Sequence, residues 1–252
     1  MERPFHNVYG KEAWARADAD LGFPGSYWLA FRDIPELIDA HVTGTRALDF
    51  GCGAGRSTRF MKERGFDAVG ADISESMLAR AREKDPEGQY LRVPDGELSG
   101  LPSDGFDLIL SALTFDNVPG REKRGHLFRE FRRLLVPGGI MINLVSSPDI
   151  YLNEWVSFST KDFPENRSAG SGDRVRIVML DVPAGLPVED VLWLDEDYRA
   201  LFDRAGLELI DYRRPLGKEG EPFEWGTELE VSPWAIYVGR NPEAVGQPRD
   251  TR

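Results

Sequence analysis

The sequence has few of the residues from which disulfides, metal sites and membrane spans are built. Cys52 is the single cysteine among 252 residues, which excludes an internal disulfide and any multi-cysteine metal site. The three histidines are scattered and form no ligand triad, so no metal is expected. No run approaches roughly 18 uncharged apolar residues, which excludes a membrane-spanning helix. The polar, acidic N-terminus is unlike a secretory signal, and a cytoplasmic protein is therefore expected.

Basic residues are also in the minority, with 31 Lys and Arg against 43 Asp and Glu and a formal net charge of −12. Nucleic-acid binders usually present fields of Lys and Arg that displace counterions from phosphates. Here the basic residues are dispersed, and we interpret the one local cluster, REKR at 121–124, as the solvated face of a helix. RNA and DNA are therefore disfavoured as partners.

Apolar runs alternate with helix-like periods between residues 45 and 145. The runs that predict strands are 47–50, 68–71, 89–93, 106–111 and 140–145. Helices are expected over 56–64 and after a cap at Ser74. A third helix is expected over Leu127, Phe128, Phe131, Leu134 and Leu135, ended by Pro137-Gly138-Gly139. This alternation predicts right-handed crossovers and a parallel sheet covered on both faces.

The flanking segments break this rhythm. Asp33 begins a capping box that predicts a helix over 34–42, preceded by an aromatic-rich stretch at 23–31. Residues 146–173 are aromatic and loop-like, and strands at 175–180 and 188–194 surround a turn at 183–185. Asp195 is expected to cap a helix that stops at Gly206, followed by strands at 207–212 and 234–238 that pair antiparallel.

The chemistry is carried by LDFGCGAGRST at 48–58, where a strand ends, three glycines alternate and a helix begins. Gly51, Gly53 and Gly55 allow positive φ and let a ligand press against bare backbone. Unpaired N–H groups of the helix face an acceptor at the carboxyl edge of the sheet, where ligands bind. Asp72 follows Gly55 by 17 residues and can accept both hydroxyls of an adenosine ribose. The spacing therefore predicts a nucleoside site.

Two features separate this loop from a dinucleotide site. The pattern is G-x-G-x-G followed by Arg56, instead of G-x-G-x-x-G, and no P-loop Gly-Lys-Ser/Thr occurs. Asp49 lies two residues before the first glycine. Its carboxylate could hold the ammonium of a methionine moiety, directly or through water, and would repel a pyrophosphate.

The sequence resembles the class I S-adenosylmethionine-dependent methyltransferases at five ordered motifs. These are LDFGCGAGRST, ADIS at 71–74, VPDGELSGLP at 93–102, FDLILSALTFDNV at 106–118 and LLVPGGIMIN at 134–143. The resemblance implies S-adenosyl-L-methionine as cofactor, with Asp95 accepting from the adenine amino group and Gly96 donating its backbone N–H. The expected cofactor contacts are Tyr27, Asp49, Gly51, Cys52, Gly53, Gly55, Ser57, Asp72, Ile73, Met77, Asp95, Gly96 and Ser111.

The resemblance implies a fold of the α/β class with a Rossmann-like seven-stranded sheet. The sheet is mostly parallel with the last strand antiparallel, helices cover both faces, and a cap is inserted after the fifth strand. The chain is expected to divide into an N-terminal lid and lead-in helix (1–44), the S-adenosylmethionine-binding core (45–145), an inserted substrate cap (146–194), a C-terminal helix and strand pair (195–240) and a disordered tail (241–252).

Acceptor contacts are expected from the N-terminal segment and from the residues after the fourth and fifth strands. The expected substrate contacts are Trp28, Phe31, Phe115, Glu154 and Trp155, and the candidate catalytic residues are Asp116, Asn117 and Tyr151. The aromatic rings could exclude water and stack on an acceptor, or could simply cover the sheet edge. Asp116 could orient or deprotonate an acceptor, or could cap the following loop.

The predicted activity is methyl transfer to a small-molecule acceptor, a metabolite or natural-product intermediate, by in-line displacement. Positioning and desolvation contribute most of the acceleration of such a reaction. A lyase or cyclase that releases methylthioadenosine needs the same nucleoside site and stays open as the alternative. The intact glycines disfavour a non-catalytic binder, and the misplaced third glycine disfavours a nicotinamide-dependent enzyme. The sequence leaves the acceptor and the oligomeric state open.

Overall fold

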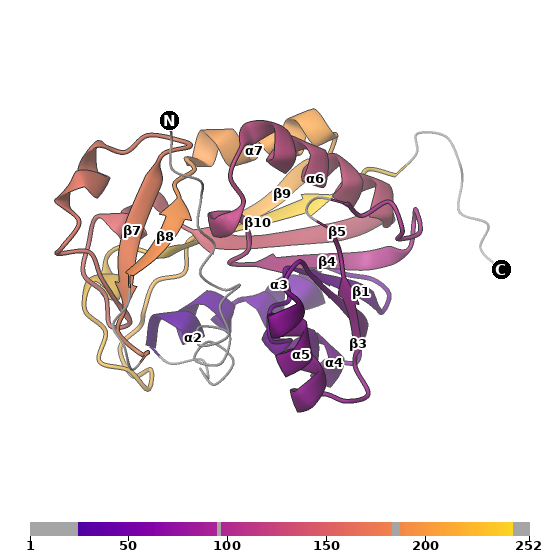
Figure 1. Ribbon diagram of the computed structural model, residues 1–252, viewed down its shortest axis with the longest axis horizontal. Helices are drawn as coiled ribbons and strands as arrows, with labels where there is room; N and C mark the ends of the chain where they lie inside the picture. The colour runs from indigo at the N-terminus through magenta and orange to yellow at the C-terminus, as the bar shows by residue number, and fades with distance from the viewer. Residues whose placement is uncertain (1–24, 95–96, 183–186, 244–252) are drawn as a thin grey trace.

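The computed structural model describes residues 25–94, 97–182 and 187–243. Within these ranges the main sheet has seven strands in the order β3-β2-β1-β4-β5-β10-β9 (Figure 1). Their bounds are β1 Arg46–Phe50, β2 Asp67–Asp72, β3 Gln89–Arg92, β4 Phe106–Ala112, β5 Leu135–Ser146, β9 Glu208–Arg213 and β10 Trp234–Arg240. Strands β1 to β5 pair in parallel, whereas β10 is antiparallel to both β5 and β9. The expected Rossmann-like sheet is confirmed.

Helices bury both faces of this sheet. The helices are α2 Gly25–Arg32, α3 Ile34–His41, α4 Arg56–Glu63, α5 Glu75–Lys84, α6 Arg121–Leu134 and α7 Asp195–Ala205. Apolar residues of α2, α3 and α4 pack on one face, and those of α6 and α7 pack on the other. Helix α5 lies against β2 and β3. Within the described residues, no helix is both long enough and apolar enough to span a bilayer.

A second, smaller sheet is inserted between β5 and α7, at the left of Figure 1. Its three antiparallel strands are β6 Phe158–Ser159, β7 Arg174–Met179 and β8 Pro187–Val191. The 3₁₀ turn η3 Pro148–Tyr151 lies between β5 and β6, and η4 Pro164–Ser168 lies between β6 and β7. We call β6, β7 and β8 the cap sheet. The turn expected at 183–185 lies outside the described residues.

The junction between α6 and β5 differs from the expectation. Helix α6 ends at Leu134, so Pro137-Gly138-Gly139 lies inside β5 and does not end the helix. Asn241 accounts for the difference: its carbonyl accepts from Gly138 N at 2.8 Å, and its own N–H donates to Gly139 O at 2.9 Å. The Asn241 side chain also donates to Leu135 O at 2.8 Å. Asn241, the first residue of the expected disordered tail, is therefore buried and bonded to the sheet.

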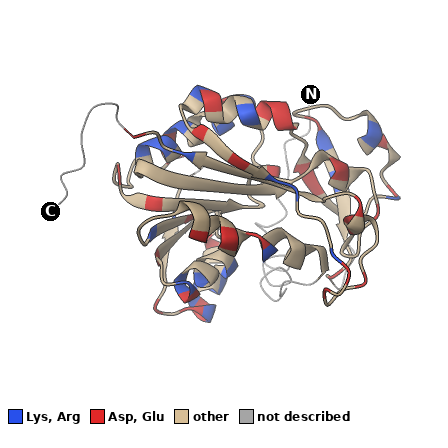
Figure 2. Ribbon diagram, turned by 180° about the vertical axis from the view of Figure 1, so that it is seen from behind, with Lys and Arg blue, Asp and Glu red and all other residues tan. Residues whose placement is uncertain are grey.

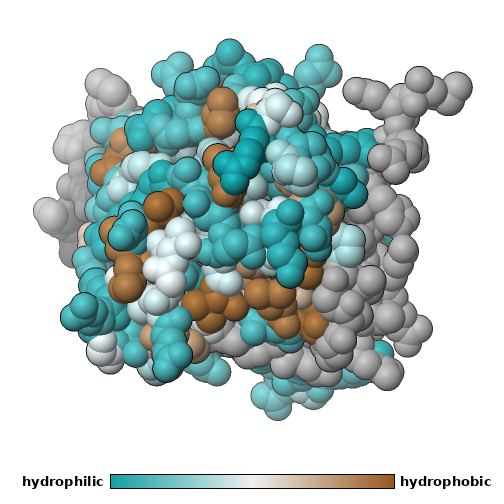
Figure 3. All heavy atoms as spheres, turned by 90° about the vertical axis from the view of Figure 1, so that its left-hand side faces the viewer, coloured by the Kyte–Doolittle hydropathy of each residue, from teal (hydrophilic) through white to brown (hydrophobic). Residues whose placement is uncertain are grey.

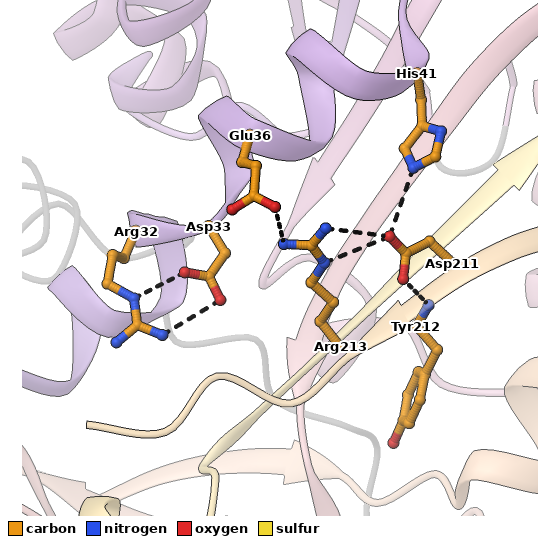
Figure 4. A network of polar contacts seen from close by, with 7 residues as sticks. All are labelled: Arg32, Asp33, Glu36, His41, Asp211, Tyr212 and Arg213. Carbon is orange, nitrogen blue, oxygen red and sulfur yellow. Dashed lines mark hydrogen bonds and ion pairs between the residues drawn. The ribbon is translucent and has the colours of Figure 1, made fainter. Parts of the chain in front are cut away.

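Of the three expected helix caps, the structure contains one. The Ser74 side chain accepts from Met77 N and caps α5. Asp33 makes no cap bond, because its carboxylate accepts from the Arg32 guanidinium (Figure 4). Asp195 is the first residue of α7 and not its cap, because its carboxylate is engaged by Arg199 and other partners.

A polar network ties α3 to the edge strand β9 (Figure 4). The Arg213 guanidinium donates to Glu36 Oε1 at 3.0 Å and to Asp211 Oδ2 at 3.4 Å. His41 Nε2 lies 3.5 Å from the same Asp211 oxygen. These side chains are partly or largely exposed, so each contact adds little stability, and α3 is held mainly by its buried apolar face.

Candidate active site

The loop between β1 and α4 is built from glycines at the carboxyl edge of the parallel strands. Gly51, Gly53 and Gly55 have φ values of 74°, 50° and 76°, which an L-residue rarely adopts. A Cβ on Gly51 would lie 2.2 Å from Thr114 Oγ1, so the backbone approaches the segment after β4 too closely for any side chain. The Gly51 N–H donates to Ala71 O at 2.8 Å and fixes the loop to β2. The result is a strip of bare backbone beside the sheet edge.

Asp72 stands at the end of β2 beside this loop. Its Oδ2 accepts from Gly53 N at 2.9 Å, and its Oδ1 accepts from Ser74 N at 2.8 Å. Asp72 borders a cavity of about 520 Å³, counting the part open to solvent, that also has apolar walls. Those walls include Ile73, Val93, Val118 and Leu127. A fixed carboxylate beside an apolar slot suits a ribose and a flat base.

A larger cavity of about 1150 Å³, counting the part open to solvent, adjoins the first. Both are bordered by Gly51, Thr114 and Asn117. The larger cavity extends from the glycine loop to the cap sheet. Leu113 in its wall has a φ of 59°, and left-handed backbone in such a residue costs about 1–2 kcal/mol. Strain of this kind is typical of binding sites.

Three aromatic rings from distant parts of the chain line the larger cavity. They are Tyr27 of α2, Phe158 of β6 and Trp234 of β10. Their ring centroids are 5.0, 5.7 and 6.1 Å apart, and all three side chains are buried. The Trp234 indole donates to Ser26 O at 2.6 Å, which fixes its ring. These residues form a rigid aromatic wall.

Two buried carboxyl groups also line the larger cavity. Asp116 follows β4 in the turn η2 (Phe115–Asn117), and its carboxylate accepts from Ser146 N at 3.2 Å and from Ser146 Oγ at 3.0 Å. Asp190 belongs to β8, and its Oδ2 accepts from the Tyr151 hydroxyl at 3.1 Å. Burial raises the pKa of Asp116 to about 6. Burial, and next the charge of Asp116, raise the pKa of Asp190 well above its ordinary value.

Arg124 of α6 holds the backbone next to Asp116 in place. It belongs to the REKR cluster expected on a solvated face, yet its side chain is fully buried. Its guanidinium donates to Val118 O at 2.7 Å and to Phe115 O. Phe115 belongs to η2 and Val118 follows it directly. Arg124 therefore holds the turn that carries Asp116. The expectation of a solvated face is therefore wrong for Arg124.

Asp49 lies beneath the glycine loop and is fully buried. Its Oδ2 accepts from Ser57 Oγ at 2.7 Å and from Thr58 Oγ1 at 2.5 Å. Its Oδ1 is buried without a hydrogen-bond partner. Burial raises the pKa of the Asp49 carboxyl to about 6. A buried oxygen that lacks a donor fits a cationic ligand group at the loop.

The comparisons with known proteins agree with this geometry. A family model described as a methyltransferase domain matches residues 48–143. N-demethylindolmycin N-methyltransferase of Streptomyces griseus is 27% identical over 187 residues, which cover 73% of this chain and 78% of that protein. Trans-aconitate 2-methyltransferase of Variovorax paradoxus is 32% identical over 237 residues, which cover 88% of this chain and 84% of that protein.

The chain belongs to the class I S-adenosylmethionine-dependent methyltransferases. A solved S-adenosylmethionine-dependent methyltransferase of Mesorhizobium loti has the same fold, with a TM-score of 0.58 at 23% identity. That comparison covers 93% of this chain and 100% of the other. The methyltransferase therefore uses S-adenosyl-L-methionine.

The two cavities bring together most of the residues expected to contact this cofactor. Tyr27, Gly51, Cys52, Gly53, Ser57 and Met77 line the larger cavity, and Asp72 and Ile73 line the smaller one. Asp49 lies beneath the loop, while Gly55 is packed against Tyr90. Ser111, like Asp49, is fully buried and lines neither cavity, so its contact with the cofactor stays a prediction. Asp95 and Gly96 lie outside the described residues.

The expected substrate contacts are divided by the structure. Phe31 lines the larger cavity, whereas Trp28, Phe115, Glu154 and Trp155 do not. The Trp28 ring packs on two other aromatic rings, at 223 and 225. Phe115, the first residue of η2, is fully buried in the core. Neither ring lines the cavity, and the assignment of both to the substrate stays a prediction.

The other two expected contacts act within the cap segment itself. The Glu154 carboxylate accepts from Thr160 N at 2.7 Å. The Trp155 indole donates to Ile150 O at 2.8 Å. Both side chains therefore stabilise the segment that follows β5, and their assignment to the substrate stays a prediction.

Among the candidate catalytic residues, Asp116 and Asn117 line the larger cavity. Tyr151 does not line it and reaches it through Asp190. The sequence interpretation missed Asp190, although a signal was present. Asp190 lies two residues after Val188 and therefore on the same, buried face of the strand, where an apolar residue is expected.

Arg56 and Arg59 at the start of α4 also border the larger cavity and were not expected to. No pattern in the sequence singles them out. Arg124 did carry a signal, because it lies at helical spacing from Leu127, Phe128 and Phe131 on the buried face of α6.

Proposed function

We propose that the methyltransferase transfers a methyl group to a small-molecule acceptor held in the larger cavity. The observation that carries this proposal is the direct junction of two cavities at Gly51, Thr114 and Asn117. The smaller cavity beside Asp72 lies on one side of the junction, and a cavity that combines apolar walls with converging polar groups lies on the other. A cavity with apolar walls and converging polar groups is typical of small-molecule sites.

The residues of the glycine loop fit the cofactor. Asp72 suits the ribose hydroxyls, and the apolar slot around Ile73 suits the adenine. The unpartnered Asp49 oxygen lies beneath the loop and would attract the ammonium of the methionine portion through water, and the Arg56 guanidinium in the cavity wall suits its carboxylate. When bound, S-adenosylmethionine supplies a methyl group activated by a positively charged sulfur. Contacts from Asp95 and Gly96 to the adenine remain predictions.

The protein's own groups would position the acceptor and keep water away. The aromatic wall of Tyr27, Phe158 and Trp234 gives the acceptor a rigid apolar surface. Asp116, which follows β4, and Asp190, which belongs to β8, place proton acceptors in the wall of the larger cavity. A carboxyl group whose pKa is about 6 is suited to proton transfer near neutral pH.

The charge distribution supports a small acceptor over a nucleic acid. Lys and Arg are interspersed with Asp and Glu along the helices in the view of Figure 2. The net charge is −12. On the side of the cap sheet, Figure 3 shows apolar side chains in patches among hydrophilic ones, the largest in the lower half of the view. A phosphate backbone needs a basic stripe. A cytoplasmic location stays a prediction from the sequence.

Product analysis by mass spectrometry tests the proposal. The purified protein is incubated with S-adenosylmethionine alone and then with a small-metabolite extract. We expect S-adenosylhomocysteine only with the extract, together with a metabolite that has gained one methyl group. Methylthioadenosine formed without an acceptor would contradict the proposal and favour the lyase or cyclase alternative. The Gly51→Ala variant, with its blocked loop, is the control for both products.

A further inference from the structure

We propose that the acceptor is an amine carried on an apolar or aromatic body, and that Asp116 and Asp190 bind its protonated nitrogen and take up the proton that methylation displaces. This inference rests on the proposed methyl transfer to a small molecule. It adds the chemical class of the acceptor, which neither the fold nor the relatives determine.

The position of Asp190 is the first argument. In the cap sheet, Val188 pairs with Ile177, Asp190 pairs with Val175, and Phe158 pairs with Met179. Directly paired residues share a face, so Asp190 is the one ionisable side chain on the buried face of these three strands. A carboxyl group there costs stability unless a partner compensates it. The Tyr151 hydroxyl, its hydrogen-bond donor, is neutral.

The balance of buried charge is the second argument. Asp116 and Asp190 are 6% and 7% exposed, and both face the same cavity. Arg124 is the only Lys or Arg among the described residues that is fully buried. Its guanidinium donates to carbonyls and to a tyrosine hydroxyl, not to either carboxylate. With both acids ionised, the group carries two negative charges and one positive, and a protonated amine would restore neutrality.

The walls of the cavity are the third argument. The faces of Tyr27, Phe158 and Trp234 are negative and attract a cation as well as an apolar body. The cationic side chains of the cavity, Arg56 and Arg59, belong to α4 at the glycine loop. The end near β5 and the cap sheet is therefore acidic and aromatic. An acceptor with a carboxylate at the reacting end would be repelled there.

The titration of the pair agrees with this geometry. Burial raises both pKa values, and the charge of Asp116 raises that of Asp190 further, so the free protein holds a proton where the amine would place its charge. The other groups that act on the pair are Arg124 from α6, Tyr198 from α7, Tyr151 from η3 and Glu189 from β8. A cation in the cavity favours the ionised acids. Amine binding should therefore release a proton below about pH 7 and strengthen as pH rises through about 6.

The chemical step balances with these groups. The bound ammonium gives one proton to the carboxylates, which frees the nitrogen lone pair. The nitrogen then forms a bond to the methyl carbon while the carbon–sulfur bond breaks and leaves its electron pair on sulfur. The methylated amine keeps the positive charge, and the carboxyl proton passes to solvent.

A matched panel of ligands tests the inference. The panel has 2-phenylethylamine and tryptamine, their alcohol analogues 2-phenylethanol and tryptophol, and the carboxylates 3-phenylpropionate and indole-3-propionate. Binding is measured by calorimetry on protein saturated with S-adenosylhomocysteine, at about pH 5.5 and about pH 8 in buffers of different ionisation enthalpy. Turnover is measured separately as S-adenosylhomocysteine formed from S-adenosylmethionine.

We expect at least one amine to bind roughly tenfold or more tightly than its alcohol, with proton release at the lower pH. Asp190→Asn should remove that preference. Glu189→Gln removes the same charge from the neighbouring position, where the side chain meets Arg174 outside the cavity, and should keep the preference. Proton release by the unmodified protein needs no variant, so the test holds even where Asp190→Asn fails to fold.

Equal binding of amines and alcohols, or no binding by either amine, would overturn the inference. An amine preference that survives in Asp190→Asn would do the same. Turnover of an alcohol or a carboxylate in place of an amine would leave the proposed small-molecule methyl transfer intact and reject the amine alone. Release of methylthioadenosine in every incubation would reject the proposed function itself.

Discussion

Replacing Arg124 with methionine removes the only fully buried cation of the described chain and keeps much of the side chain's volume. Three buried acceptors lose a donor: Phe115 O, Val118 O and, at 3.0 Å, the Tyr198 hydroxyl. Each unsatisfied group costs about 1–3 kcal/mol, partly offset because the guanidinium no longer needs to be desolvated. We expect the free energy of unfolding to fall by about 3–5 kcal/mol, the sum of three such losses less the recovered desolvation.

Urea-induced unfolding, followed by far-ultraviolet circular dichroism at about pH 7.5, measures this change. Arg129→Met is the matched control, because Arg129 is exposed on the same helix, and its effect should stay within about 0.5 kcal/mol. Arg124→Met should also weaken turnover more than cofactor binding, since η2 carries Asp116. A loss of stability below about 1 kcal/mol would refute the reasoning that the guanidinium holds this turn.

Four further predictions concern the cofactor site and a residue remote from it. Gly51→Ala places a Cβ 2.2 Å from Thr114 Oγ1 at a φ of 74°, and calorimetry should show cofactor binding lost. Asp72→Ala should weaken S-adenosylmethionine binding roughly tenfold or more, and unchanged affinity would reject the ribose assignment. The pKa of Asp49 is raised to about 6, so the native state holds this proton more tightly than the unfolded chain. Stability from this group should therefore fall as pH rises from about 4 to about 6, by about 3 kcal/mol in urea titrations. Cofactor affinity should rise from about pH 5 to about pH 7, and a persistent rise in Asp49→Asn would contradict the assignment to the ammonium. Trp28→Leu should lower the melting temperature and leave the KM for the acceptor unchanged, because the ring packs outside the cavity; a raised KM would restore Trp28 as a substrate contact.

The sheet could be predicted because buried parallel strands are continuous apolar runs, and five such runs precede the antiparallel pair at the end. The end of α6 could not. Pro137-Gly138-Gly139 has the local signature of a helix stop, but Asn241, about a hundred residues later, pairs with it as strand. Long-range pairing of this kind leaves no trace in a local window.

The cofactor half of the site was predictable because its geometry is local. The glycines, Asp49 and Asp72 lie within one β–α–β unit, where spacing in the sequence sets position in space. The acceptor half is assembled from α2, η2, the cap sheet and β10, whose relative placement depends on packing. Aromatic residues such as Trp28 and Trp155 could therefore be expected to cover the sheet edge or to contact a ligand, and the sequence could not decide between the two.

Charged residues were misinterpreted for a related reason. Arg124 is part of a charge run, yet it is buried because two carbonyls and a hydroxyl meet its guanidinium from different elements. Asp190 follows Glu189, and two adjacent acids do not by themselves indicate that one of them is buried. In both cases the phase of the residue on its helix or strand was the informative signal.

A structure determined with S-adenosylhomocysteine bound tests the central claim most directly. We predict the adenosine in the smaller cavity beside Asp72 and Ile73, with the sulfur at the junction by Gly51 and facing Asp116 across the larger cavity. A nucleoside bound elsewhere would contradict the account, and so would a sulfur that faces away from the cavity that Asp116 and Asp190 line.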